Sequence, residues 1–288
     1  MYVLAALAAA ALFAASTVLK HRSAQAVVTE QPSGAGLAGV VRRTVRHPAW
    51  LGGIAVDVGA LALQVVALHL GPLATVQPLL SVSIVLALMV DHRAVPRAVW
   101  GWALLLVLGI AGFVLLSGSG TTGSAPDGGP TALTCLLVVA VIAACLTVNR
   151  RLRSGLTAAT TLGLGVGITY AGSAALLKVV GNDAVRHGVL TLLGSWQLYA
   201  VVACGVSGML LNQLAFSAGP LRHSLPTISA VDPVASVLIG VVVFDERLRL
   251  GSGYGVAQVT ALAAVVTAIV AIGRARAGRK RSSAVATP

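Results

Sequence analysis

The amino-acid sequence predicts an all-α polytopic membrane protein with about nine transmembrane helices. Hydrophobic residues make up 57% of the 288 residues and charged residues only 10%, whereas a soluble domain has about 25% charged residues. The mean hydropathy is +0.92, and at about 20 apolar residues per crossing there is room for roughly nine or ten spans. This composition excludes an ordinary soluble enzyme. It also excludes a soluble nucleic-acid-binding domain, despite a net charge of +12.

The first apolar run begins at Tyr2, and its nearest basic residues, Lys20 and Arg22, follow it. A secretory signal peptide has the opposite order, with its basic residues in front of the apolar run. The small residues Ala14-Ala15-Ser16 also fit a cleavage site, and cleavage is the alternative. The charge order favours a segment that is retained as the first span.

Charged residues and Gly/Pro-rich segments divide the sequence into nine apolar runs. Two pairs of neighbouring runs are separated by only two residues, at Gly71 and at Gly219. We expect a tight helical hairpin at each point, because the glycine ends one helix and the following proline, Pro72 or Pro220, begins the next. The nine predicted spans lie near residues 2–19, 49–69, 72–90, 98–117, 131–148, 157–177, 194–217, 222–244 and 252–273.

The Lys and Arg residues predict an orientation, because cytoplasmic loops carry the excess of positive charge. With the N-terminus outside, sixteen of the twenty basic residues fall in inner segments. We therefore expect a plasma-membrane protein with its N-terminus outside and its C-terminus in the cytoplasm, next to anionic lipids. The four basic residues of the outer segments are Lys178, Arg186, Arg247 and Arg249.

An internal repeat is visible in the hairpin sequences. A Gly-Pro pair followed six residues later by a second proline occurs twice, 148 residues apart. Gly71, Pro72 and Pro78 form the first copy, and Gly219, Pro220 and Pro226 form the second. The same shift relates Gln64 to Asn212, Ala67 to Ala215, and Ser81 to Ser229.

The repeat predicts two inverted four-helix halves, with spans one to four matching spans six to nine and the fifth span as a connector. Five crossings separate the two starts, so the halves have opposite orientations. Inverted repeats of this kind place a binding site at their interface. The predicted units are a first membrane repeat (1–117), a loop and connector helix (118–148), a second repeat (149–273) and a basic cytoplasmic tail (274–288).

Two carboxylates are predicted to lie well inside a span, and such groups are functional candidates by default. Asp57 lies about eight residues into the second span, and Gln64 shares its face because seven residues are close to two helical turns. Asp57 and Asp232 together are candidate ligands for a divalent cation, since Mg²⁺ needs only one or two carboxylates plus water.

Asp232 lies in the middle of the eighth span, on one polar stripe with Ser229 and Ser236. Pro233 follows it and lacks a backbone N–H, which should kink the helix and leave a carbonyl free to bind a cation or an ammonium group. The alternative is a structural role for Asp232 within a broken helix.

Amides and hydroxyls form a second set of candidates that could line one cavity. The alternative for each is interhelical hydrogen bonding. This set comprises Gln64, Gln77, Ser81, Asn212, Gln213 and Ser229. Lys20 and Lys178 lie at predicted span ends, where snorkelling to water is favoured over a substrate role. Glu246 is assigned to an outer loop.

The hairpin residues Gly71, Pro72, Gly219 and Pro220, together with the cluster Asp245-Glu246-Arg247 after the eighth span, resemble the drug/metabolite transporter superfamily. EamA-type permeases of that superfamily commonly have ten spans in two inverted halves. Nine spans, and a first span that ends in a Lys-containing run, resemble the NIPA-type magnesium transporters more closely. The resemblance implies transport by alternating access, and it leaves the substrate open.

Enzyme signatures are missing from the sequence. It contains no GxxxxGK[ST] phosphate loop, no HExxH and no Ser/His/Asp arrangement, and its three cysteines have no metal-ligand or disulfide spacing. We therefore expect no enzymatic activity, no cofactor and no nucleic-acid partner.

Three functions remain open on the sequence alone. The first is a secondary transporter of a small polar metabolite or cation, the second a divalent-cation transporter, and the third a non-transporting membrane scaffold or subunit. The expected partners are the lipid bilayer and the substrate, with a homodimer possible.

Overall fold

The protein is all-helical in the part of the chain described by its structure, a computed structural model. The described residues are 1–29, 46–90, 97–117, 129–152, 156–218, 221–246 and 253–285, and they contain helices and no strand. The predicted fold class is therefore confirmed at this level. The helices are α1 (Tyr2–Thr29), α3 (Pro48–Leu70), α4 (Leu73–Leu80), α5 (Val82–Val90), α6 (Arg97–Ser117), α7 (Gly129–Leu152), α8 (Leu156–His187), the 3-10 helix η2 (Val189–Gly194), α9 (Trp196–Ala218), α10 (Leu221–Val243) and α11 (Tyr254–Val285).

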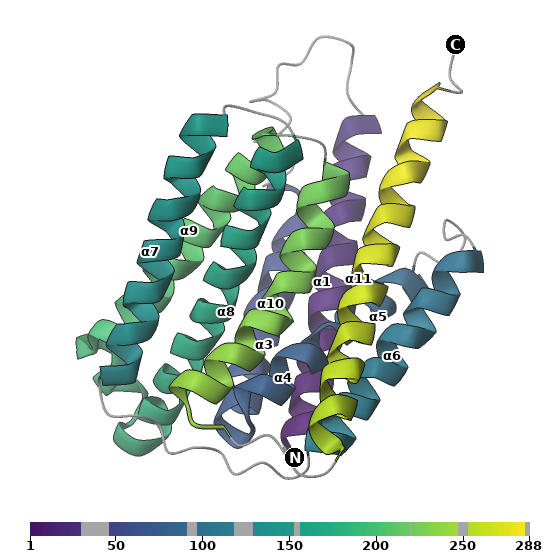
Figure 1. The fold of residues 1–288 in the computed structure, drawn as a ribbon. Helices are drawn as coiled ribbons and strands as arrows, with labels where there is room; N and C mark the ends of the chain where they lie inside the picture. The colour runs from purple at the N-terminus through teal and green to yellow at the C-terminus, as the bar shows by residue number, and fades with distance from the viewer. Residues whose placement is uncertain are drawn as a thin grey trace.

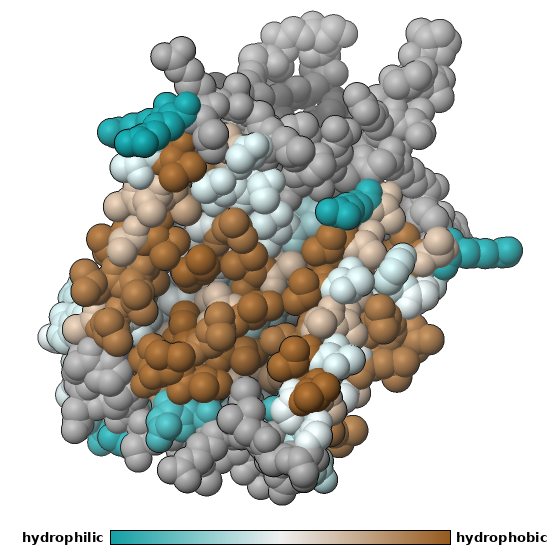
Figure 2. All heavy atoms as spheres, in the orientation of Figure 1, coloured by the Kyte–Doolittle hydropathy of each residue, from teal (hydrophilic) through white to brown (hydrophobic). Residues whose placement is uncertain are grey.

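Nine helical segments of the described chain are long and apolar enough to cross a membrane, with α4 and α5 together counted as one. They form a bundle with the two termini at opposite ends, as an odd number of crossings requires (Figure 1). Brown apolar side chains cover much of the middle of the face seen in Figure 2. Large apolar residues such as Val206 and Met209 of α9 are more than half exposed, which is typical of a surface that faces lipid.

Helix α3 begins and ends where the sequence predicts. Pro48 occupies its first turn, and the Nδ1 atom of His47 accepts a hydrogen bond from the Ala49 N–H at 3.2 Å. Pro is favoured in the first turn because the N–H groups there have no intrahelical partner. Gly71 ends the helix with an extended backbone, and the predicted tight hairpin follows. The corresponding Gly219 and Pro220 lie outside the described residues.

The predicted span 72–90 is two helices, α4 and α5, interrupted at Ser81. Pro78 has no N–H to donate to the carbonyl of Ala74, which weakens the helix at this turn. The Ser81 N–H instead donates to the Pro78 carbonyl at 3.1 Å. In α10, by contrast, both Pro226 and Pro233 lie inside one uninterrupted helix.

Three helices extend well beyond the predicted spans. Helix α1 continues to Thr29, and α11 continues to Val285 through the segment predicted as a flexible tail. Helix α8 continues ten residues past the predicted end of its span. Ala, Arg, Lys and Leu favour helix in water as well as in lipid, so apolar runs underestimate helix length.

The main hydrophobic core contains residues from both the N-terminal and the C-terminal half of the sequence. Its buried residues come from α1, α3, α4, α5 and α6, and from α8, α10 and α11. Helix α1 packs along α3, α8 packs against both α9 and α10, and α6 packs along α11. The short helix α4 also contacts α10. Helices α8 and α10 therefore connect the two parts of the bundle.

Candidate functional site

The turn between α3 and α4 is buried, which is unusual for a loop. Gly71, Pro72 and the whole of α4 up to Leu79 are buried, so their backbone polar groups need protein partners. Pro72 is the N-cap of α4 and provides no side-chain hydrogen bond. The partners come instead from residues far away in the sequence.

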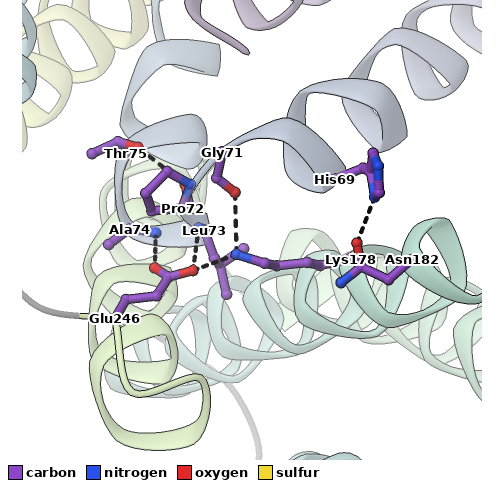
Figure 3. Close-up of polar contacts among 9 residues, drawn as sticks. All are labelled: His69, Gly71, Pro72, Leu73, Ala74, Thr75, Lys178, Asn182 and Glu246. Carbon is purple, nitrogen blue, oxygen red and sulfur yellow. Dashed lines mark hydrogen bonds and ion pairs between the residues drawn. The ribbon is translucent and has the colours of Figure 1, made fainter. Parts of the chain in front are cut away.

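Glu246 and Lys178 supply those partners (Figure 3). The Glu246 carboxylate accepts hydrogen bonds from the Leu73 N–H at 2.6 Å and the Ala74 N–H at 2.8 Å, and so caps α4. A negative charge is favourable at this position because the helix dipole is positive at its N-terminus. The Lys178 ammonium donates to the Gly71 carbonyl at 3.1 Å. We call Gly71, Leu73, Ala74, Lys178 and Glu246 the latch cluster.

The two charges of the latch cluster neutralise each other. Lys178 Nζ lies 2.5 Å from Glu246 Oε1, and the two side chains are 1% and 2% exposed. The ammonium also lies 5.2 Å from the centre of the Phe244 ring, a favourable cation–π distance. The snorkelling predicted for Lys178 is wrong, because its side chain is buried and lies inside α8. Glu246 follows the end of α10, as predicted, but its side chain is buried.

The end of α10 turns back to place Glu246. Asp245 has a left-handed backbone (φ 49°), which Asp tolerates better than most residues. The Glu246 N–H then donates to the Gly240 carbonyl at 3.0 Å. Gly240 is required here, because a Cβ atom at this position would collide with the Glu246 carboxylate.

The latch cluster is a closed structural unit. Each of its charges has an opposite charge and backbone hydrogen bonds, as a buried ion pair needs in order to be tolerated. It joins the α3–α4 turn to α8 and to the end of α10, at the end of the bundle that carries the N-terminus (Figure 1). Both charged side chains therefore have their partners within the protein.

Asp57 also has a basic partner. Its carboxylate pairs with the ammonium of Lys20 from α1, and both side chains are about one quarter to one third exposed. Gly53 makes room for the lysine stem, since a Cβ there would lie 2.7 Å from Lys20 Cγ. The apolar span of α1 ends at Lys20, as predicted, although the helix continues to Thr29. Its ammonium is the counter-ion of Asp57.

Asp232 has no such partner. Among the described residues, no Lys, Arg or His nitrogen lies within 4.0 Å of its carboxylate. It is the twelfth of the 23 residues of α10, roughly 17 Å from either end of the helix at 1.5 Å per residue. The Ser236 hydroxyl, one turn further on, lies 3.4 Å from Asp232 Oδ1. This long hydrogen bond joins two of the three residues of the predicted stripe.

Tyr170 of α8 lies within electrostatic range of Asp232, and Asn212 of α9 interacts with Tyr170. The Tyr170 ring of α8 packs on Gly208 of α9, where a Cβ would lie 2.8 Å from Tyr170 Cε1. Its hydroxyl interacts with the side chain of Asn212, one turn along α9, and lies within electrostatic range of Asp232. The Asn212 Oδ1 atom is buried and has no hydrogen-bond partner. We call Tyr170, Asn212, Ser229, Asp232 and Ser236 the Asp232 cluster.

The remaining predicted site residues are not joined to Asp232 by any recorded contact of the described chain. Gln64 and Gln77 are buried, and the Gln77 Nε2 atom has no hydrogen-bond partner. Ser81 is partly exposed at the end of α4, and Gln213 is exposed on α9.

Three important residues were missed or misassigned from the sequence. Tyr170 belongs to the segment TYAGSAALLK but is not predicted as a candidate, although a tyrosine at membrane depth needs a partner for its hydroxyl. Lys178 is a lone charge inside an apolar run and Glu246 belongs to a charged cluster, so the sequence gives no signal that pairs the two. His69, half-buried at the end of α3, contacts Asn182 at 2.7 Å between Nδ1 and Oδ1 (Figure 3).

No group of three or more His, Cys, Asp or Glu side chains in the described chain is arranged to hold a metal ion. Two shallow hollows lie on its surface, one beside Val256 and Thr260 and one beside Asp183 and His187. Neither is lined by Asp232.

Comparison with known proteins gives a relative over nearly the whole chain, with no described activity. Over 286 residues the chain is 27% identical to an uncharacterized protein of Corynebacterium glutamicum, an alignment that covers 97% of this chain and 98% of the relative. No family model and no solved structure matches the chain. The similarity runs through all the helices, and it brings no activity with it.

Proposed function

We propose that the protein is a secondary transporter of a small polar metabolite or cation, and that it works by alternating access. The observation that supports this most strongly is Asp232, a carboxylate at the centre of a membrane-spanning helix with no basic partner among the described residues. Charged groups at this depth are costly, and they usually mark a substrate or ion pathway.

The packing of the helices supports two inverted halves. Helix α1 packs on α3 as α8 packs on α9, and the helices that the repeat pairs with each other, α6 with α11 and α4 with α10, are in contact. Contacts between equivalent helices are expected at a pseudo-twofold axis in the membrane plane. They favour a transporter of the drug/metabolite superfamily type over a scaffold.

The latch cluster suggests which end of the bundle is closed. It joins α4 of the first half to α8 and α10 of the second half, through a fully buried ion pair. Alternating access then requires this cluster to separate when the end carrying the N-terminus opens. In the proposed orientation, with the N-terminus outside and the C-terminus in the cytoplasm, this end faces out of the cell.

A divalent-cation transporter is the less favoured alternative. Asp57 would be a natural second ligand to Asp232, but its carboxylate is paired with Lys20. Mg²⁺ is held by one or two carboxylates plus water and is strongly selective for oxygen ligands. A transport assay can include this ion directly.

The test is uptake into vesicles reconstituted with purified protein, using a panel of metabolites and magnesium. We expect at least one substrate to accumulate above the level of protein-free vesicles. Asp232→Asn should reduce the initial rate of uptake by at least about tenfold, which corresponds to a loss of about 1.4 kcal/mol of binding free energy. Asp57→Asn is the matched carboxylate control and should retain most of the uptake rate. Equal rates for the parent and Asp232→Asn would overturn the assignment of the site.

A further inference from the structure

The Asp232 cluster contains an excess of hydrogen-bond acceptors. The Asp232 carboxylate has only the long contact from Ser236, and the Asn212 Oδ1 atom has no partner. The Ser229 carbonyl lacks the usual donor four residues further on, because Pro233 has no N–H. These three acceptors of α9 and α10 therefore have unused hydrogen-bonding capacity.

The charge of the cluster is also unbalanced. Asp232 has no basic side chain within 4.0 Å in the described chain, whereas Asp57 and Glu246 each have a lysine. An uncompensated carboxylate in an apolar environment is unfavourable unless a ligand or a proton neutralises it. A ligand that fits must bring both positive charge and hydrogen-bond donors.

Close packing of the neighbouring helices limits the size of the charged group. A Cβ atom on Gly167 of α8 would lie 2.7 Å from Val231 Cβ and 3.0 Å from the Ile228 carbonyl oxygen. Between α8 and α9 the Tyr170 ring lies directly on Gly208. Aromatic rings also attract cations, so the Tyr170 ring adds a favourable surface for a positive charge.

We propose that the Asp232 cluster binds a primary ammonium group, with the Asp232 carboxylate as its counter-ion and Asn212 Oδ1 and the Ser229 carbonyl as acceptors of its N–H donors. This inference rests on the proposed function and names its substrate class. A primary ammonium has three N–H donors and no acceptor. A quaternary ammonium has the same charge but no donor.

The test compares two probes with the same hydroxyethyl group, ethanolamine in its ammonium form and choline, in which methyl groups replace the three N–H donors. Thermal unfolding of the purified protein is measured with each probe, at an ionic strength matched with sodium chloride. At about ten times the dissociation constant, ethanolamine should raise the unfolding midpoint by about 2–4 °C. Choline should give less than a third of this shift.

Matched variants assign the effect to the cluster. Asp232→Asn should abolish the ethanolamine shift, Asp232→Glu should retain part of it because the charge is kept, and Asp57→Asn should retain all of it. Size-exclusion chromatography and the midpoint without ligand verify that each variant is folded. No shift in the parent protein, an equal shift with choline, or a full shift in Asp232→Asn would each overturn the proposal.

Uptake of radiolabelled ethanolamine into reconstituted vesicles separates this proposal from the proposed function. Protein-free vesicles correct for passive entry of the uncharged amine. If ethanolamine gives an Asp232-dependent shift but neither ethanolamine nor any member of the panel is taken up, the binding class holds and the transport function is wrong. If the vesicles transport a substrate without an ammonium group and ethanolamine gives no shift, the transport function holds and the binding class is wrong.

Discussion

Asp232 and Glu246 lie fourteen residues apart on the same stretch of chain and have opposite surroundings. The Glu246 carboxylate has a lysine partner and two backbone N–H donors, and its side chain is 2% exposed. The Asp232 carboxylate has one long contact from a serine and no basic partner among the described residues. The first is therefore suited to hold the fold together, and the second to interact with a ligand.

The difference follows from the cost of burying charge. A buried ion pair is tolerated when its remaining donors and acceptors are satisfied, and removing one partner leaves an uncompensated charge. The latch cluster satisfies this condition through the backbone of the buried α3–α4 turn. The Asp232 cluster does not satisfy it. Mutations in the latch cluster should therefore lower the stability of the protein, and mutations in the Asp232 cluster should mainly affect ligand binding.

The largest effect is expected when one charge of the latch cluster is removed. Glu246→Gln leaves the Lys178 ammonium buried without a counter-ion, which should lower the free energy of unfolding by about 3–5 kcal/mol. Lys178→Met should have a similar effect. Denaturant unfolding of the purified protein in detergent measures both variants.

The double variant provides the control for this prediction. Lys178→Met with Glu246→Gln contains no buried charge, so it should lose less stability than the sum of the two single variants. Strictly additive losses would show that the two side chains do not act as a pair.

A smaller effect is expected from the glycine that lets Glu246 approach α10. Gly240→Ala places a Cβ against the Glu246 carboxylate, and overpacking of this kind should cost about 1–3 kcal/mol. The matched control is Gly205→Ala in the interior of α9, where a Cβ meets nothing within 4 Å. That change should stabilise the helix by about 0.5–1 kcal/mol. Equal melting behaviour of the two variants would contradict the proposed geometry of the latch cluster.

The fold was largely predictable because lipid imposes one strong pattern. Apolar runs locate the nine helical segments of the described chain that are long and apolar enough to cross a membrane, and α3 ends at the Gly71-Pro72 hairpin where the sequence predicts. Helix length was underestimated, since α8 continues past Lys178 to His187. Hydropathy describes the preference of side chains for lipid. It does not describe the backbone hydrogen bonds that continue a helix into polar sequence.

The candidate site was predictable only within single helices. The stripe of Ser229, Asp232 and Ser236 follows from helical spacing, and its Ser236–Asp232 contact is present. Pairings between helices, such as Lys178 with Glu246 and Lys20 with Asp57, depend on how helices pack, and local sequence patterns do not determine this. Gln64 illustrates the same point, because the repeat relates its position to Asn212 but does not give its partner.

The smallest change in stability, and the sharpest test, is expected for Asp232→Asn. If the Asp232 carboxylate interacts with a ligand and not with the rest of the protein, replacing it by the neutral amide of Asn removes an uncompensated charge and leaves the packing intact. The measurement is the free energy of unfolding of Asp232→Asn and of the parent protein, without ligand and in the same detergent. Our account predicts that the variant is at least as stable as the parent. A loss of about 2 kcal/mol or more, the size expected for a satisfied buried group, would contradict it and would make Asp232 a structural residue like Glu246.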